Sequence, residues 1–124
     1  MDILFLGFVA AIARCRLYSL TSDGFGLREI VFDTETTGLD PVAGHRVVEI
    51  GCVELFNGIP TGKHLHYYLD PERDMPDEAF KVHGLSSEFL KGQKRFREIA
   101  EEFVAFTEGA KLVVGFETLK LVDR

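Results

Sequence analysis

Two carboxylates two residues apart, Asp33 and Glu35, are the feature of this sequence best suited to chemistry. They follow residues 29–32, a short and largely apolar run that predicts a buried strand. Side chains two apart on a strand point to the same face, so the two carboxylates can converge. A hard divalent cation such as Mg²⁺ or Mn²⁺ takes oxygen ligands and relieves their mutual repulsion. The pair therefore indicates a metal site, and the alternative is a turn in which Asp33 bonds to nearby backbone while Glu35 faces solvent.

The residues around this pair resemble the first motif of the DEDD-type 3′→5′ exonucleases, a family with a ribonuclease H-like fold. The motif here is Phe32–Gly38, read as Phe-Asp-Thr-Glu-Thr-Thr-Gly. Three further segments follow in the family's order, at residues 44–55, 68–73 and 78–85. Together the four segments look like the proofreading (epsilon) subunits of bacterial DNA polymerase III, over roughly residues 28 to 114.

The resemblance implies a site, two cofactor ions and two partners. Asp33 and Glu35 match two metal ligands of the family, in which two ions, Mg²⁺ or Mn²⁺, serve phosphodiester hydrolysis. Together with Glu78 and His83, they match positions that contact the terminal nucleotide. The implied partners are a DNA 3′ end and the polymerase III catalytic subunit. On spacing alone, the alternative for His83 is a histidine favoured by the dipole at a helix C-terminus.

Residues 115–124 match neither the family's second motif, which supplies an Asp ligand, nor its third, which supplies a His and another Asp. Beyond the metal ligands, then, no catalytic residue is retained, because the general-base histidine belongs to the third motif. We therefore expect a proofreading-type 3′→5′ exodeoxyribonuclease truncated after the fourth strand, through a frameshift or as a fragment. The alternative is an inactive fragment or binding remnant.

The hydrophobic pattern predicts the elements that position the site. Strands are expected at about 29–34, 46–56, 62–69 and 111–114, with a hairpin turn at Asn57-Gly58. A helix is expected at about 94–108, and its predicted apolar stripe is Phe96, Ile99, Ala100, Phe103 and Val104. Asp77 and Ser86 are candidate caps of two short helices. These elements predict an α/β fold, a ribonuclease H-like mixed sheet in which a three-strand antiparallel meander gains a parallel fourth strand, incomplete at the C-terminus.

The remaining histidines, His45, His64 and His66, are interpreted as structural or surface residues. His64 and His66 share a strand face, but no third ligand is apparent in the sequence.

The composition fits one modest domain of 124 residues. A formal net charge of −6 argues against tight, non-specific nucleic-acid binding. Two cysteines far apart suit a reducing cytosol, so a cytoplasmic location is expected. The apolar run at residues 3–13 is shorter than the about 20 residues of a membrane span, so no membrane partner is expected.

Three parts of the chain are distinguished. Residues 1–26 are interpreted as an extra N-terminal leader, residues 27–115 as the N-terminal part of the exonuclease domain, and residues 116–124 as a tail outside the family. For the leader, a core helix and a weak membrane-surface anchor are the alternatives.

Overall fold

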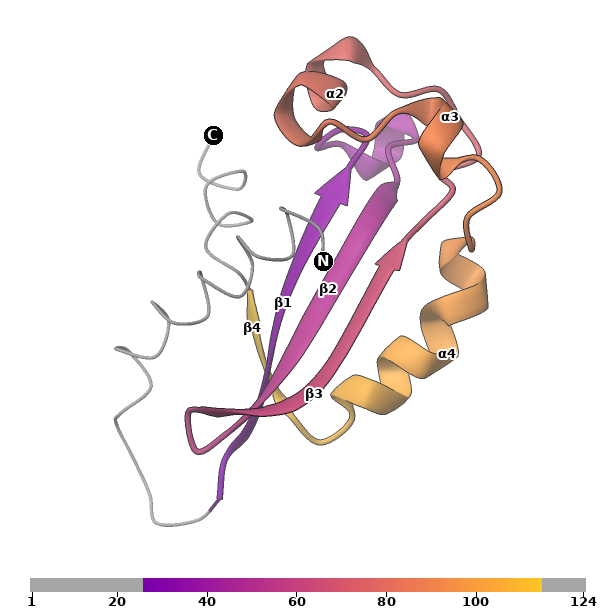
Figure 1. Ribbon diagram of the computed structural model, residues 1–124. Helices are drawn as coiled ribbons and strands as arrows, with labels where there is room; N and C mark the ends of the chain where they lie inside the picture. Colours follow the sequence, from indigo (N-terminus) through magenta and orange to yellow (C-terminus); the bar gives the residue numbers. More distant parts are fainter. Residues whose placement is uncertain (1–25, 115–124) are drawn as a thin grey trace.

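A computed structural model of the protein describes residues 26–114, which form a four-stranded mixed sheet with helices (Figure 1). The strand order is β3-β2-β1-β4. The elements in chain order are β1 Arg28–Thr36, the 3₁₀ helix η1 Pro41–Ala43, β2 Val47–Phe56, β3 Ile59–Tyr68, α2 Asp77–His83, α3 Ser87–Leu90, α4 Phe96–Thr107 and β4 Lys111–Val114. The expected leader and tail lie outside the described residues. Within those residues, no helix is long and apolar enough to cross a membrane.

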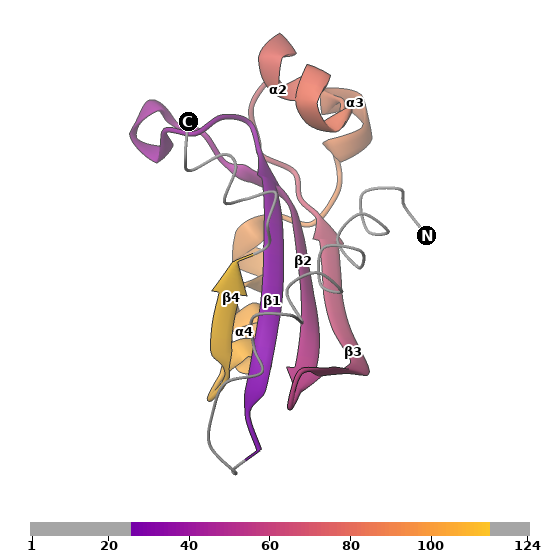
Figure 2. The ribbon, with the colours of Figure 1, turned by 90° about the vertical axis from the view of Figure 1, so that its left-hand side faces the viewer.

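The sheet has the predicted topology. β1 pairs antiparallel with β2, β2 pairs antiparallel with β3, and β4 runs parallel to β1 at its other edge (Figure 2). The β2–β3 turn is the predicted one, because Asn57 and Gly58 have φ values of 51° and 77°, the left-handed pair that a type I′ hairpin requires. Because the turn has only these two residues, β3 begins at Ile59, earlier than the predicted start at about residue 62.

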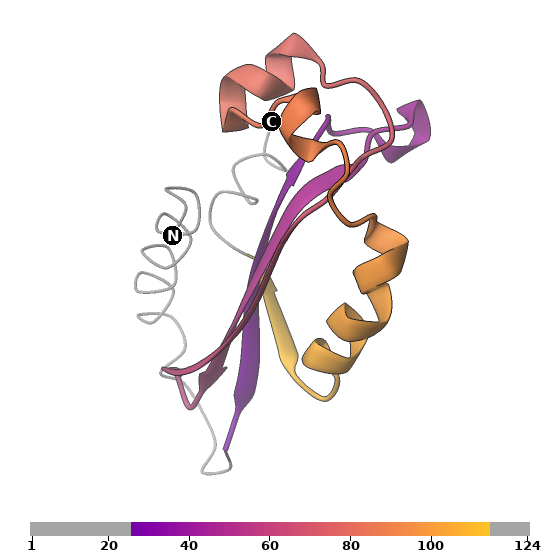
Figure 3. The same cartoon turned by 45° about the vertical axis from the view of Figure 1, so that its right-hand side comes forward.

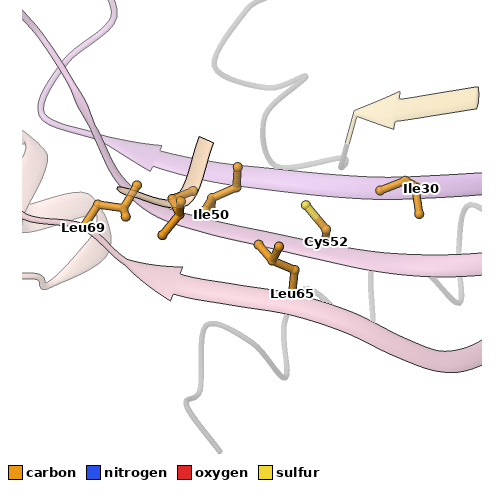
Figure 4. Packing of buried hydrophobic residues seen from close by; sticks show 6 residues of the cluster. Ile30, Ile50, Cys52, Leu65 and Leu69 are labelled. Atoms are coloured by element: carbon orange, nitrogen blue, oxygen red, sulfur yellow. The ribbon is translucent and has the colours of Figure 1, made fainter. Parts of the chain in front are cut away.

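The main core lies between the sheet and α4, which covers one face (Figure 3). Its buried residues, most of which are labelled in Figure 4, are Ile30, Ile50, Cys52, Leu65, Leu69 and Ile99. Phe103 of α4 meets Phe32 of β1 edge to face, with ring centroids 6.5 Å apart. Burial raises the pKa of the Cys52 thiol to about 12, so the thiol stays protonated and acts as a small core side chain.

The predicted apolar stripe of α4 is partly wrong. Ile99 is fully buried and Phe103 packs on the core, but Phe96 and Val104 are 45% and 63% exposed. Phe106, in contrast, packs against the core. The sheet therefore contacts a line through residues 99, 103 and 106, and the residues flanking that line face outward.

Two short helices, α2 and α3, lie beyond the end of the sheet at which β1 ends (Figure 1). Ser86 caps α3 as predicted, since its Oγ accepts a hydrogen bond from the Phe89 N–H at 3.1 Å. Asp77 does not cap α2. The extended backbone of Pro76 takes the N-cap position, and Asp77 falls in the first turn, where a negative charge complements the helix dipole.

Arg28 joins the start of β1 to β2 and to the end of α4. Its Nε donates to Glu54 Oε2 at 2.6 Å, and its Nη1 donates to the Glu108 carbonyl at 2.9 Å. Thr61 of β3 donates to the other Glu54 oxygen at 2.8 Å. These hydrogen bonds hold the pKa of Glu54 below its usual range, and the bond from Arg28 has the largest effect. Glu54 is thus a buried carboxylate with both oxygens satisfied, on the face of β2 toward α4.

Candidate active site

Asp33 and Glu35 lie on the sheet face opposite α4. Ile30 packs under α4, and alternate residues of a strand point to opposite faces, so residues 33 and 35 project to the other side. In the β1–β2 ladder, Asp33 pairs with Gly51 and Glu35 pairs with Glu49. One oxygen of Asp33 also accepts the Thr34 N–H at 2.9 Å, which orients that carboxylate at the strand end. The two side chains therefore share one sheet face, and their convergence on one ion stays a prediction.

Thr37 fixes the loop that follows the pair. It is 1% exposed, its N–H donates to the Arg46 carbonyl at 2.9 Å, and its Oγ1 accepts the Arg46 N–H at 2.9 Å. The same hydroxyl lies 3.0 Å from Nδ1 of His45. Gly38 follows beneath that imidazole, and a Cβ at Gly38 would come within 2.5 Å of its ring atoms. Thr37, Gly38 and His45 together set the path of the chain from β1 toward β2.

We predict that Gly38→Ala lowers the free energy of unfolding by about 1–3 kcal/mol, the usual cost of overpacking. The added methyl group must displace the His45 ring, which would then lose its contact with Thr37. Urea denaturation measures the loss. In a His45→Ala background the ring is gone, so Gly38→Ala should cost much less there. Equal costs in both backgrounds would contradict the assigned contact.

His83, at the C-terminus of α2, connects that helix to the end of β1. It is 7% exposed, its Nε2 lies 3.1 Å from the Thr36 carbonyl, and its Nδ1 accepts the Leu85 N–H at 3.0 Å. A carbonyl oxygen can only accept, so Nε2 carries the proton and the ring is neutral. Burial lowers the pKa of His83, which favours the same neutral form. Both ring nitrogens are thus hydrogen-bonded to backbone, and His83 acts here as a positioning group.

A cavity of about 590 Å³ lies beside the end of β1. Glu35, Glu78 and His83 line it, so three of the four predicted substrate-binding residues meet there. Its apolar wall includes Leu39, Ala79 and Val82. Asp33 is outside this lining, although it shares the face of Glu35. A mixed lining and a volume of this size are typical of a small-molecule ligand site. Direct contact of Glu78 and His83 with a nucleotide stays a prediction.

The donor set fits a hard divalent ion in part. Asp33 and Glu35 offer carboxylate oxygens, which Mg²⁺ and Mn²⁺ prefer. Within residues 26–114, no group of three His, Cys, Asp or Glu side chains comes close enough together to hold a metal ion. The described part of the chain thus offers at most the two predicted ligands, Asp33 and Glu35.

The sequence analysis did not single out Glu49, which contacts His66, one of the histidines interpreted as structural or surface residues. Glu49 is 7% exposed, and its Oε1 lies 3.3 Å from Nε2 of His66. The signal in the sequence was a glutamate between Val48 and Ile50, in a strand whose only other charged residue is Glu54.

Comparison with known proteins identifies the family. The sequence model of an exonuclease family, of the RNase T type, matches residues 30–119. The chain belongs to this exonuclease family. It is 57% identical over 88 residues to DNA polymerase III subunit epsilon of Rickettsia prowazekii (strain Madrid E), covering 71% of this chain and 38% of that protein. It is 46% identical over 91 residues to the Escherichia coli (strain K12) epsilon subunit, covering 70% of this chain and 37% of that protein. This exonuclease chain thus spans well under half the length of its curated relatives.

Solved structures confirm the fold. The nuclease domain of 3′hExo, described as a DEDDh family member bound to rAMP, has a TM-score of 0.58 at 17% identity, covering 75% of this chain and 52% of that one. Escherichia coli exonuclease I, in complex with an oligonucleotide, has a TM-score of 0.64 at 16% identity, covering 78% and 22%. The predicted ribonuclease H-like class and the predicted relation to DEDD exonucleases and epsilon subunits are both confirmed.

Proposed function

We propose that this exonuclease chain carries the metal-binding and nucleotide-binding half of an epsilon-type 3′→5′ proofreading site. The observation that carries the proposal is the position of Glu35. It shares a sheet face with Asp33 and also lines the cavity beside β1. A group at that position can hold an ion and face a bound nucleotide at once. The family relation supplies the reaction class, removal of 3′-terminal nucleotides from DNA.

In this proposal, Asp33 and Glu35 hold the divalent ions, Mg²⁺ or Mn²⁺, through oxygen ligands. The ions supply an activated water and positive charge at the scissile phosphate when bound. Glu78, exposed on α2 at the cavity, accepts hydrogen bonds from the sugar of the terminal nucleotide. Leu39 and Val82 offer apolar surface to its base. His83 holds the end of β1, and with it Glu35, against α2.

The wider assignments belong to the same proposal. Residues 27–115 form the N-terminal part of the exonuclease domain, residues 1–26 a leader, and residues 116–124 a tail. The partners are a DNA 3′ end and the polymerase III catalytic subunit, in the cytoplasm. The homologous epsilon subunits support this assignment.

A second candidate function is a binding remnant without hydrolysis. It is favoured by one observation, that residues 26–114 bring no third metal ligand to Asp33 and Glu35. Such a chain would retain the nucleotide cavity and bind DNA ends without cutting them.

A chimera tests the proposed function. Residues 30–114 replace the matching segment of the Rickettsia prowazekii epsilon subunit, which supplies the rest of that protein. We expect the chimera to remove a mismatched 3′ nucleotide from a primer in Mg²⁺, and Asp33→Asn to abolish the reaction. Glu101→Gln, at an exposed carboxylate of α4, serves as the control and should leave the rate unchanged. A folded chimera that cuts nothing, or one that Asp33→Asn does not affect, would overturn the proposal.

A further inference from the structure

Glu49 has one carboxylate oxygen that the fold does not satisfy. Its side chain is 9% exposed, and its Oε1 lies 3.3 Å from Nε2 of His66. Its Oε2 is buried and has no hydrogen-bond partner within the part of the chain that the structure describes. Buried polar atoms in native proteins are rarely left in this state, and the explanations for the exceptions include backbone strain, a catalytic role and a bound water or ion. Glu54, further along β2 and on the opposite face of the sheet, shows the ordinary case, with both oxygens bonded.

The register places Glu49 on the sheet face of the candidate metal site. Glu49 is directly opposite Glu35 in the β1–β2 ladder, so the two side chains share a face. His66 pairs with Gly51, which pairs in turn with Asp33. Glu49 therefore shares one sheet face with His66 and with both predicted metal ligands.

Glu49 is not a third direct ligand, because no three such groups within residues 26–114 come close enough to hold an ion. A hydrogen-bond acceptor that contacts a water of the ion, and not the ion itself, fits the chemistry instead. Mg²⁺ keeps several of its waters when proteins bind it, and Mn²⁺ takes the same kinds of ligand. Those waters donate hydrogen bonds, and acceptors around a metal site orient what the ion holds.

We propose that Glu49 is a positioning residue of the metal site. Its Oε2 accepts a hydrogen bond from a water held by the divalent ion at Asp33 and Glu35, and His66 fixes the carboxylate through Oε1. This inference rests on the proposed function, because it requires the ion to bind at Asp33 and Glu35. If Glu49 only paired with a protonated His66, it would support the fold and leave metal affinity untouched.

Mn²⁺ titration of the full 124-residue chain tests the inference, with unbound Mn²⁺ followed by electron paramagnetic resonance. Glu49→Met keeps an unbranched side chain and removes both acceptor oxygens. We expect it to weaken Mn²⁺ binding at least about tenfold, the usual effect of losing an outer-shell partner. Glu49→Gln, which keeps one oxygen, should weaken it less. Glu54→Gln is the matched control on the same strand and should leave Mn²⁺ affinity unchanged.

Thermal melting without metal gives a second readout. Glu49→Met removes a buried oxygen that has no hydrogen-bond partner within residues 26–114, so its melting temperature should equal or exceed that of the parent chain. Glu54→Gln weakens the bond from Arg28 and should melt earlier. Should Glu49→Met fail to fold, Glu49→Gln carries the same comparison.

The outcomes separate the two proposals. If Asp33→Asn removes Mn²⁺ binding and both Glu49 variants retain it in full, the role of Glu49 is wrong and the proposed site stands. If Asp33→Asn also leaves binding unchanged, the metal site itself is wrong. A Glu49→Met variant that melts earlier and binds Mn²⁺ as the parent does would show a purely structural Glu49 and overturn the inference.

Discussion

The 124-residue polypeptide is expected to leave a 3′-mismatched primer intact in Mg²⁺ or Mn²⁺, even though Asp33 and Glu35 should bind the ion weakly. Hydrolysis by two ions needs both of them held together and a base within reach of the attacking water. Residues 26–114 provide two carboxylates on one face and no group of three metal ligands. His83, which lines the cavity together with Glu35, has both nitrogens bonded to backbone and cannot act as that base without breaking the fold locally.

A primer-degradation assay checks this expectation, with the chimera described above as the active reference. The polypeptide should turn over at least about three powers of ten more slowly, the scale on which loss of members of a catalytic unit acts. Turnover by the 124-residue chain that disappears with Asp33→Asn would contradict the expectation. It would mean that residues outside the described range, or a second chain, complete the site.

The fold could be predicted because its signals are local. The Asn57-Gly58 pair specifies a tight hairpin, and the structure uses both residues at positive φ. The apolar run at residues 111–114 after a helix predicted the parallel fourth strand, since a crossover helix joins parallel strands. The exposure of Phe96 could not be predicted from periodicity, because the helical pattern does not say which edge of an apolar stripe meets the sheet.

The candidate site could be predicted only within one strand. The i, i+2 spacing of Asp33 and Glu35 fixes their common face wherever β1 lies. Glu49 required the register between β1 and β2, and the connection from Thr36 to Val47 holds no tight turn that would set it. That Glu49 and His66 share a sheet face could have been predicted from the sequence. With the register that the tight turn sets, Glu49 and His66 would be directly opposite each other. The irregularity between Val53 and Leu55 shifts the β2–β3 register by two residues, and a shift of two keeps both side chains on the same face.

His83 shows a different limit of prediction from the sequence. Its place before a helix-ending glycine is visible in the sequence, and Gly84 indeed has a φ of 71°. Its partners are not visible, because the Thr36 carbonyl lies far from it in the chain. Family position predicts substrate contact, which stays a prediction, and the geometry adds that the buried ring joins the end of β1 to the turn after α2.

His83→Ala is expected to lower the free energy of unfolding by about 2–5 kcal/mol. The Thr36 carbonyl and the Leu85 N–H would each lose a buried partner, at about 1–3 kcal/mol apiece. Urea denaturation at neutral pH measures this loss. His64→Ala, at an exposed position on β3, is the control and should change stability little.

The same contacts predict a dependence on pH. His83 has a folded pKa below its ordinary value of 6.5, chiefly because of burial, so the unfolded chain binds a proton more readily than the folded one. Between the folded pKa and 6.5, the free energy of unfolding therefore rises with pH. The stabilisation is complete above about 6.5 and is lost as pH falls through the window below it, because a protonated Nδ1 can no longer accept the Leu85 N–H. His83→Ala should remove this part of the pH dependence while His64→Ala keeps it. A pH profile of stability that is the same in His83→Ala and in the parent chain would show that the buried, neutral His83 is not what holds the end of β1 to α2.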